Sequence, residues 1–187
     1  MAKLKTKHTK KLLTSFAKGI ISQAEKILKA KKKNVSGKLL NSLKYKIKEA
    51  KGGSGFNLSF QGAKHANFVD KGVSGVKKRR MFNNIYGKTK KSPFSFKSGV
   101  GNSPNIGALE KWISRKGIKG RDELGRFIKT KSLAYLFSKS IQREGLKATS
   151  FFSTSVYTQY KKFKPKLLSA FKKDLIERIK QMDTSKL

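Results

Sequence analysis

Residues 43–61 read LKYKIKEAKGGSGFNLSFQ, and this stretch decides the fold. In each half, apolar side chains alternate with polar ones, which is the period of a strand that buries one face. Gly52-Gly53-Ser54-Gly55 joins the two halves, so the stretch predicts an antiparallel β-hairpin. A phosphate-binding glycine loop is not expected, because such a loop joins a strand to a helix and ends in Gly-Lys-Ser or Gly-Lys-Thr. The expected apolar face carries Leu43, Tyr45, Ile47, Phe56, Leu58 and Phe60.

An amphipathic helix is expected on each side of this hairpin. Apolar residues spaced by three and four predict one helix over about residues 9–32 and another over about residues 165–182, which starts at Pro165. We expect both apolar stripes to lie in the core. The first stripe is Leu13, Phe16, Ile20, Ala24 and Ile27, and the second is Leu168, Phe171, Leu175, Ile179 and Met182.

Two inserted helices are expected in the second half of the chain. Ser103-Pro104 would start the first helix, as N-cap and first helical residue, and Gly117 would end it. The second would span residues 130–144 and stop at Gly145. Residues 151–160 are rich in β-forming side chains and are expected to return to the sheet. The expected core positions of the two helices are Ile106, Leu109, Ile113, Leu133, Leu136, Phe137 and Ile141.

Two connecting segments complete the expected organisation. Ser36 is expected to cap a short helical turn that carries Leu39 and Leu40. Residues 71–103 form a long loop whose interspersed aromatic side chains indicate that it docks on another surface. Together the patterns predict a single domain, residues 1–187, with an α+β fold: a small antiparallel sheet packed by N-terminal and C-terminal amphipathic helices, with the long loop and two inserted helices.

The composition leaves little material for catalysis. The chain has no cysteine, two histidines and ten acidic residues, which excludes thiolate nucleophiles and cysteine-based metal sites. No nucleophile or second acid accompanies His65 and Asp70 in the sequence, so we expect a structural hydrogen bond there rather than acid–base chemistry. His8 is expected to be solvated, and Asp122 and Glu123 to pair with neighbouring arginines rather than bind Ca²⁺. We expect no enzyme, no metal and no cofactor.

The formal net charge of +36 indicates a polyanionic partner. Only seven of the 46 basic residues are arginines, and lysine suits diffuse phosphate contact better than readout of base edges. A lysine-rich, cysteine-free composition can also follow from AT-rich coding, so both interpretations stay open. Residues 71–100 hold nine basic residues and no acidic one. The candidates for binding nucleic acid or an acidic protein partner are Lys77, Lys78, Arg79, Arg80, Lys88, Lys90 and Lys91.

Three short motifs follow one another along the chain. The first is a Gly-x-Leu-x-x-Ser turn that enters the first strand, and the second is a Tyr-Ala-x-Phe-Val-Glu-x-Gly segment, here with His for Tyr and Asp for Glu. The third is a Pro-Phe segment before the last helix, here without its proline. In this order they resemble the head–tail connector and tail-completion family, the small neck proteins of tailed phages. The matching residues are Gly37, Leu39, Ser42, His65, Ala66, Phe68, Val69, Asp70, Gly72, Phe151 and Phe152.

This resemblance implies a non-enzymatic structural protein of the virion. Such proteins form cyclic rings around the DNA channel, so the expected partners are further copies of the chain and the phage portal, adaptor and tail proteins. Non-specific contact with genomic DNA is a further expectation, and a membrane is not expected. The implied location is the neck or tail of the virion, with the host cytoplasm during assembly. A non-specific nucleic-acid-binding or packaging protein is the alternative, and a membrane-active basic protein is a third.

Overall fold

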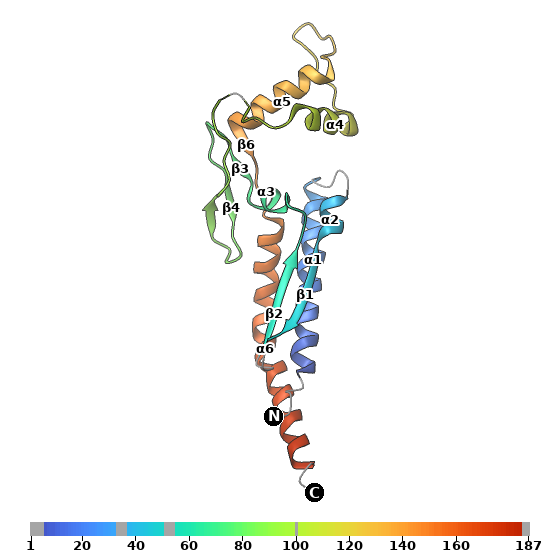
Figure 1. Cartoon of the computed structure of the whole chain (residues 1–187), viewed down its shortest axis with the longest axis vertical. Coiled ribbons are helices and arrows are strands. Elements are labelled where there is room, and N and C mark those ends of the chain that lie inside the picture. The colour runs from blue at the N-terminus through green and yellow to red at the C-terminus, as the bar shows by residue number, and fades with distance from the viewer. Residues whose placement is uncertain (1–5, 33–36, 51–54, 100, 185–187) are drawn as a thin grey trace.

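Two long helices, α1 (Lys7–Ala30) and α6 (Phe151–Thr184), lie side by side in opposite directions and form the main body of the molecule (Figure 1). Phe16 of α1 stacks on Phe163 of α6 with ring centroids 4.5 Å apart. The side-chain amide of Gln159 on α6 donates a hydrogen bond to Gln23 on α1 at 2.8 Å. The fold is α+β, as expected. This computed structural model describes residues 6–32, 37–50, 55–99 and 101–184.

The predicted hairpin is confirmed. Strands β1 (Lys44–Glu49) and β2 (Phe56–Gln61) pair in an antiparallel register that places Tyr45 opposite Phe60. The apolar side chains of both strands are half-buried, whereas the alternating lysines, Lys44, Lys46 and Lys48, are exposed. The hairpin lies along the helix pair (Figure 1), so one face of the sheet is covered and the other faces solvent. The turn residues Gly52, Gly53 and Ser54 lie outside the described residues.

A buried apolar cluster lies where both long helices meet the short helix α2 (Lys38–Ser42) and the end of the hairpin. Leu39 and Leu40 of α2 are buried, as the sequence predicts. The expected cap of this helix, Ser36, lies outside the described residues. The buried members of the cluster are Ala24, Leu28, Leu39, Leu40 and Phe151, and the partly buried ones are Ile27, Leu43, Ala63, Ala66, Val69 and Phe152.

Helix α1 has almost the predicted extent, but the centre of its buried face is shifted by one position. Ala17 and Leu28 are fully buried, whereas the predicted Phe16 and Ile27 are only half-buried. The small alanine side chains on this face allow α6 to pack closely against α1. Burying each of the larger Leu or Ile side chains stabilises the fold by about 1.5–3 kcal/mol. The buried residues of α1 are Thr9, Ala17, Ile20, Ala24 and Leu28.

The prediction for residues 151–182 is wrong in two respects. The expected strand at 151–160 is helical, and α6 begins at Phe151 and continues through Pro165. The expected core stripe of this helix is largely exposed: 62% of Leu168 and 59% of Ile179 are accessible to solvent. The side chain of Met182 lies outside the described residues. The C-terminal half of α6 therefore presents apolar side chains that the chain itself does not cover.

The expected long loop at 71–103 contains three short strands, which corrects that prediction. Two of its aromatic side chains dock on the chain itself: Phe82 is buried, and the ring of Phe94 lies 4.5 Å from that of Phe68 on α3 (Ala66–Lys71), whereas Tyr86 is 72% exposed. The strands are β3 (Val73–Ser74), which pairs with β6 (Gly145–Leu146), and β4 (Met81–Asn83), which pairs with β5 (Thr89–Lys91).

The two inserted helices, α4 (Ile106–Lys116) and α5 (Thr130–Glu144), form a separate pair at one end of the molecule (Figure 1). Trp112 and Phe137 join them edge to face, with ring centroids 5.8 Å apart. The N-cap of α4 is Asn105, whose side-chain oxygen accepts the Ala108 N–H at 3.0 Å, and not the predicted Ser103.

The predicted ends of these helices are confirmed, whereas the predicted core of α5 is only partly correct. Gly117 and Gly145 have φ of 63° and 74°, values that favour glycine. Along α5 the buried residues are Ala134, Ser138 and Gln142, and the larger apolar side chains are half-buried or exposed. The pair α4–α5 has too little surrounding structure to bury them.

Replacing Gly72 with alanine is expected to destabilise the protein by about 3 kcal/mol or more. A Cβ atom there would lie 2.6 Å from the carbonyl oxygen of Leu146 and 2.7 Å from the nitrogen of Ala148, and φ is +70°. Gly125→Ala is the matched control, because φ is +77° but no atom lies within 4 Å of its Cβ. Thermal unfolding checks the result: equal losses in the two variants would show that the close contacts do not matter.

Candidate functional site

The second of the three short motifs, His65–Gly72, contains α3. Hydrogen bonds connect this segment to the start of α6. Asp70 is only 4% exposed, and its carboxylate accepts the backbone N–H groups of Phe152 and Ser153 at 2.8 and 3.2 Å. The hydroxyl of Ser153 donates to the same carboxylate. The first N–H groups of a helix have no partner within it, so Asp70 supplies the missing acceptor from another element.

The backbone strengthens this junction. The N–H of Thr149 donates to the carbonyl of Val69 at 3.0 Å, and the N–H of Ser150 donates to that of Asp70 at 2.8 Å. His65 is exposed, and the hydrogen bonds of the Asp70 carboxylate go to α6. The Asp70 carboxylate accepts from α6 and not from His65, so the expected structural hydrogen bond between the two residues is wrong, and the geometry does not join them for acid–base chemistry.

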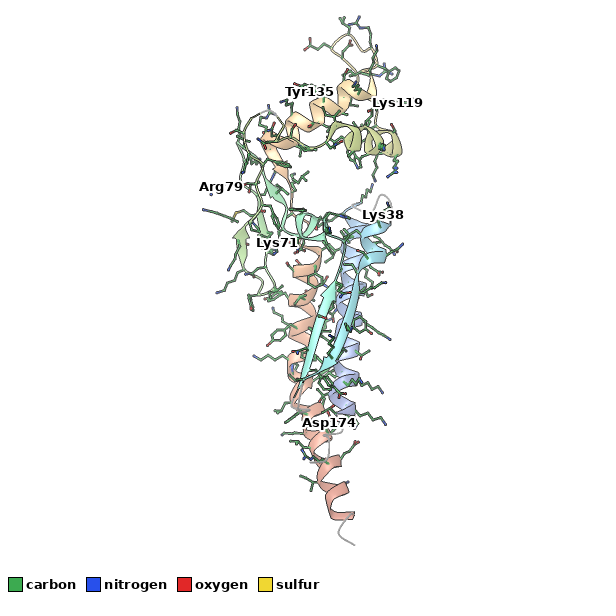
Figure 2. All side chains as sticks on the ribbon, viewed as in Figure 1. Lys38, Lys71, Arg79, Lys119, Tyr135 and Asp174 are labelled. Atoms are coloured by element: carbon green, nitrogen blue, oxygen red, sulfur yellow. The ribbon has the colours of Figure 1, made fainter. Side chains whose placement is uncertain are left out.

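A second buried carboxylate caps the other long helix. Asp174 of α6 accepts the backbone N–H groups of His8 and Thr9 at 2.8 and 2.9 Å, and the Thr9 hydroxyl at 2.6 Å (Figure 2). The ring of His8 contacts Glu177 at 2.7 Å, so the expectation that His8 is solvated is wrong. Burial raises the pKa of Asp174, but the hydrogen bonds from Thr9 and His8 outweigh it, and the pKa lies below its ordinary value of 3.8.

Asp174→Asn is expected to cost about 2 kcal/mol at pH 7, and the difference from the parent protein is expected to shrink in acid. Because the pKa of Asp174 is lower in the folded protein than its ordinary 3.8, the charged cap stabilises fully above that pH. This contribution is lost as the pH falls through the folded-state value. Denaturant unfolding at pH 7 and in steps below pH 3.8 measures it, and a pH-independent difference would contradict the assignment.

The remaining acidic residues do not assemble a metal site in the described part of the chain. No three His, Asp or Glu side chains there lie close enough to hold an ion. Asp122 pairs with Arg126 at 2.9 Å, as expected for a neighbouring arginine.

In the same described ranges, no helix combines the length and the apolar composition needed to cross a membrane.

The basic run Lys77–Arg80 lies in the loop between β3 and β4, and its members differ. Lys77, Lys78 and Arg79 are exposed, and Arg79 projects outward from the molecule (Figure 2). Arg80 is half-buried: its Nη2 donates to the carbonyl of Gly145 at 3.4 Å, whereas its buried Nε has no hydrogen-bond partner. Arg80 is therefore held within the fold, and the first three residues form the accessible part of the run.

The β4–β5 hairpin brings the second basic run towards the first. Lys90 and Lys91 lie opposite Phe82 and Met81, the two residues that directly follow Arg80. Lys88 lies further away, at the turn, where its N–H donates to the side chain of Asn84 at 2.9 Å. All three lysines are exposed. The structure thus gathers most of the predicted basic candidates along one edge of the molecule.

Two further basic residues, Lys139 and Arg143 of α5, join Lys77 around a cavity of about 550 Å³. They lie more than 60 positions from Lys77 in the sequence. No local sequence pattern connects Lys139 and Arg143 to Lys77. The packing of the β3–β4 loop against the end of α5 brings the three residues together.

The second surface that sequence reasoning missed is the exposed apolar face of α6, hereafter the α6 apolar face. It was expected to be core, but α1 covers a different side of the helix. Beyond Glu177, which contacts the start of α1, the helix continues past its partner (Figure 1). The members of this face are Leu167, Leu168, Phe171, Leu175, Ile176 and Ile179, which are 36–62% exposed.

Comparisons with protein-family models, with curated proteins and with solved structures find no match. The resemblance to phage neck proteins is carried by the order of three short motifs. In the structure, two of these motifs meet: Asp70 of the second motif bonds to Phe152 of the third. Leu39 of the first motif packs in the same apolar cluster as Phe151.

Proposed function

We propose that this protein is a non-enzymatic structural subunit that assembles into a cyclic ring, as the head–tail connector proteins of the phage neck do. The ring would join the portal or adaptor to the tail and surround the DNA channel. It would contain copies of this chain and contact phage portal, adaptor and tail proteins. Its location would be the virion neck, with assembly in the host cytoplasm.

The observation that carries this proposal is the α6 apolar face. Soluble monomers rarely expose contiguous rows of large apolar side chains, and such rows mark sites of protein association. Leu168 and Leu175 project from the part of α6 that Asp174 anchors to α1, so their exposure is not a result of a loose helix, and Ile179 continues the same face beyond Glu177. A partner surface that covers them would stabilise the assembly by about 1–2 kcal/mol at each position, because only 36–62% of each side chain is exposed.

The shape of the molecule supports a head-to-tail assembly. The α4–α5 pair and the free end of α6 project at opposite ends of the molecule (Figure 1). Tyr135 and Leu136 on α5 are also half exposed, which adds a second apolar surface at the far end. Contacts between two different surfaces of identical subunits generate rings when the rotation closes. The chain therefore has the separate surfaces that a head-to-tail arrangement requires.

Sedimentation equilibrium of the purified chain, alone and mixed with portal, adaptor and tail proteins, tests this proposal. The expected result is a discrete species whose mass is a multiple of the 21.0 kDa subunit, or a stable complex with one of these proteins. A protein that stays monomeric at every concentration, and that binds none of them, would contradict the proposal.

A second candidate function, non-specific binding of nucleic acid, is supported by the basic edge. Lys77, Lys78 and Arg79 are accessible next to Lys90 and Lys91, and no acidic residue occurs in 71–100. Contacts to phosphates carry affinity without sequence information. The two functions are compatible if the basic edge of the subunit faces DNA in the channel.

Salt dependence tests the second candidate. The logarithm of the affinity for duplex DNA should fall with the logarithm of salt concentration with a slope of about −0.9 per phosphate contacted. Replacing Lys77, Lys78 and Arg79 by glutamine should reduce the steepness of that slope by about 2–3. If no DNA binding is detected even at low salt, this candidate is excluded.

A further inference from the structure

The cavity at the end of α5 has the chemistry of a site for a phosphate group. Its wall includes the cationic Lys77, Lys139 and Arg143 and the hydroxyl-bearing Ser98 and Ser140, and none of its lining residues is acidic. We propose that this cleft, of about 550 Å³, binds one phosphate group, either of a free phosphate or nucleotide or of a nucleic-acid backbone. This proposal goes beyond the assembly function and does not depend on it.

Backbone hydrogen bonds fix one wall of the cleft. The N–H groups of Val76 and Lys77 donate to the carbonyls of Gln142 and Arg143, at 2.9 and 3.0 Å. These carbonyls belong to the last turn of α5, where a helix has no internal donors left and carries partial negative charge. The two N–H groups offset that charge and hold Lys77 beside Arg143. An anion in the cleft therefore does not face unpaired carbonyl oxygens of Gln142 and Arg143.

The buried side chain of Gln142 fixes the other wall. Its amide nitrogen donates to the carbonyls of Lys97 and Gly99, both at 3.1 Å. This pair of bonds holds the segment that contains Ser98 against α5, where Ser140 lies on the same helix. Serine hydroxyls can donate to phosphate oxygens, so the wall offers neutral donors beside the cationic groups.

The charges of the cleft are only partly neutralised. Arg143 uses its Nε to bond Glu144 at 3.1 Å, and its two Nη groups carry further donors that suit a phosphate in a bidentate contact. The ammonium of Lys139 lies 5.6 Å from the ring centroid of Tyr135, an uncharged neighbour that leaves its positive charge unneutralised. Lys77 adds a third positive charge, which leaves the cleft with a net positive charge.

Apolar side chains give the cleft room for more than an inorganic ion. Val76 and Leu136 line it and are 49% and 53% exposed, so each offers an apolar surface beside the cationic groups. A sugar or base attached to the phosphate would cover these surfaces. We therefore expect adenosine monophosphate to bind more tightly than inorganic phosphate.

Calorimetric titration with inorganic phosphate and with adenosine monophosphate tests the site. Both are expected to bind saturably at one site, and Lys77→Gln with Lys139→Gln should weaken each affinity by about tenfold or more. The matched control, Lys162→Gln with Lys164→Gln on exposed positions of α6, removes the same charge and should change neither affinity by more than about twofold. Lys139→Gln alone should show a smaller loss in the same direction.

Two results would overturn the proposal: no saturable binding of phosphate, adenosine monophosphate or a short DNA duplex, or equal losses of every affinity in the cleft variant and its control. A short DNA duplex distinguishes the sources of the phosphate. A larger loss of DNA affinity in the cleft variant than in the control would assign the site to the nucleic-acid backbone. An equal loss of DNA affinity, with phosphate binding reduced only in the cleft variant, would assign it to free phosphate or nucleotide.

Discussion

Asp70→Ala is expected to lower the free energy of unfolding by about 3 kcal/mol. The substitution removes the acceptor for the N–H groups of Phe152 and Ser153 and for the Ser153 hydroxyl, and these donors stay buried without a partner. For a chain of this size, such a loss corresponds to a fall in melting temperature of about 6–12 °C. Thermal and denaturant unfolding measure it.

Two controls separate the cap from a general effect of removing an acid. Asp70→Asn keeps one acceptor oxygen and is expected to lose about 1 kcal/mol. Glu123→Ala removes a carboxylate from an exposed loop position and is expected to leave the melting temperature unchanged. If Asp70→Ala unfolds at the same temperature as the parent protein, Asp70 does not hold the start of α6.

Leu168→Ala with Ile179→Ala is expected to weaken self-association by about 100-fold and to leave the stability of the single subunit unchanged. Both side chains are about 60% exposed on the α6 apolar face, so a neighbouring subunit and not the chain itself would bury them. Because alanine has a high helix propensity, the variant loses apolar surface but keeps the helix. Sedimentation velocity over a range of concentrations measures the change.

The control for this variant is Leu124→Ala. Leu124 is 76% exposed in the loop between α4 and α5, at the end of the molecule away from α6 (Figure 1). It removes one leucine side chain, half of what the α6 variant removes, and Leu124 is not one of the two residues, Tyr135 and Leu136, of the second apolar surface, so it is expected to change association little. An unchanged association constant in the α6 variant, or equal losses in both variants, would show that the α6 apolar face is not the contact between subunits.

The elements that local periodicity encodes could be predicted from the sequence. The hairpin follows from strict alternation around residues 43–61, because a period of two places every apolar side chain on one face. α1 follows from apolar spacing, and the helix at 130–144 follows from apolar spacing and from Gly145 at its end. None of these elements needs a distant partner to fix its type.

The start of α6 could not be predicted, because a distant residue determines it. Val156, Tyr157 and Thr158 favour a strand locally, whereas Asp70, about 80 positions earlier, caps the N–H groups that begin a helix at Phe151. The expected start at Pro165 is wrong for the same reason, since the helix is already formed when the chain reaches that residue.

The surfaces were only partly predictable. Lys77 and its neighbours are visible as a charge run, but Lys139 and Arg143 join them only through tertiary packing. The α6 apolar face has the spacing expected of a core helix, and the sequence does not state whether the chain or another subunit covers it. Amphipathic spacing identifies a face that needs a partner, and the source of the partner depends on the fold.

Electron cryomicroscopy of the purified chain, alone and together with portal, adaptor and tail proteins, tests the central claim most directly. The structure-based proposal predicts closed rings of identical subunits around a central channel, with Leu168 and Ile179 of α6 buried where neighbouring subunits meet. Particles that contain only single subunits, or rings in which the α6 apolar face stays exposed to solvent, would contradict it.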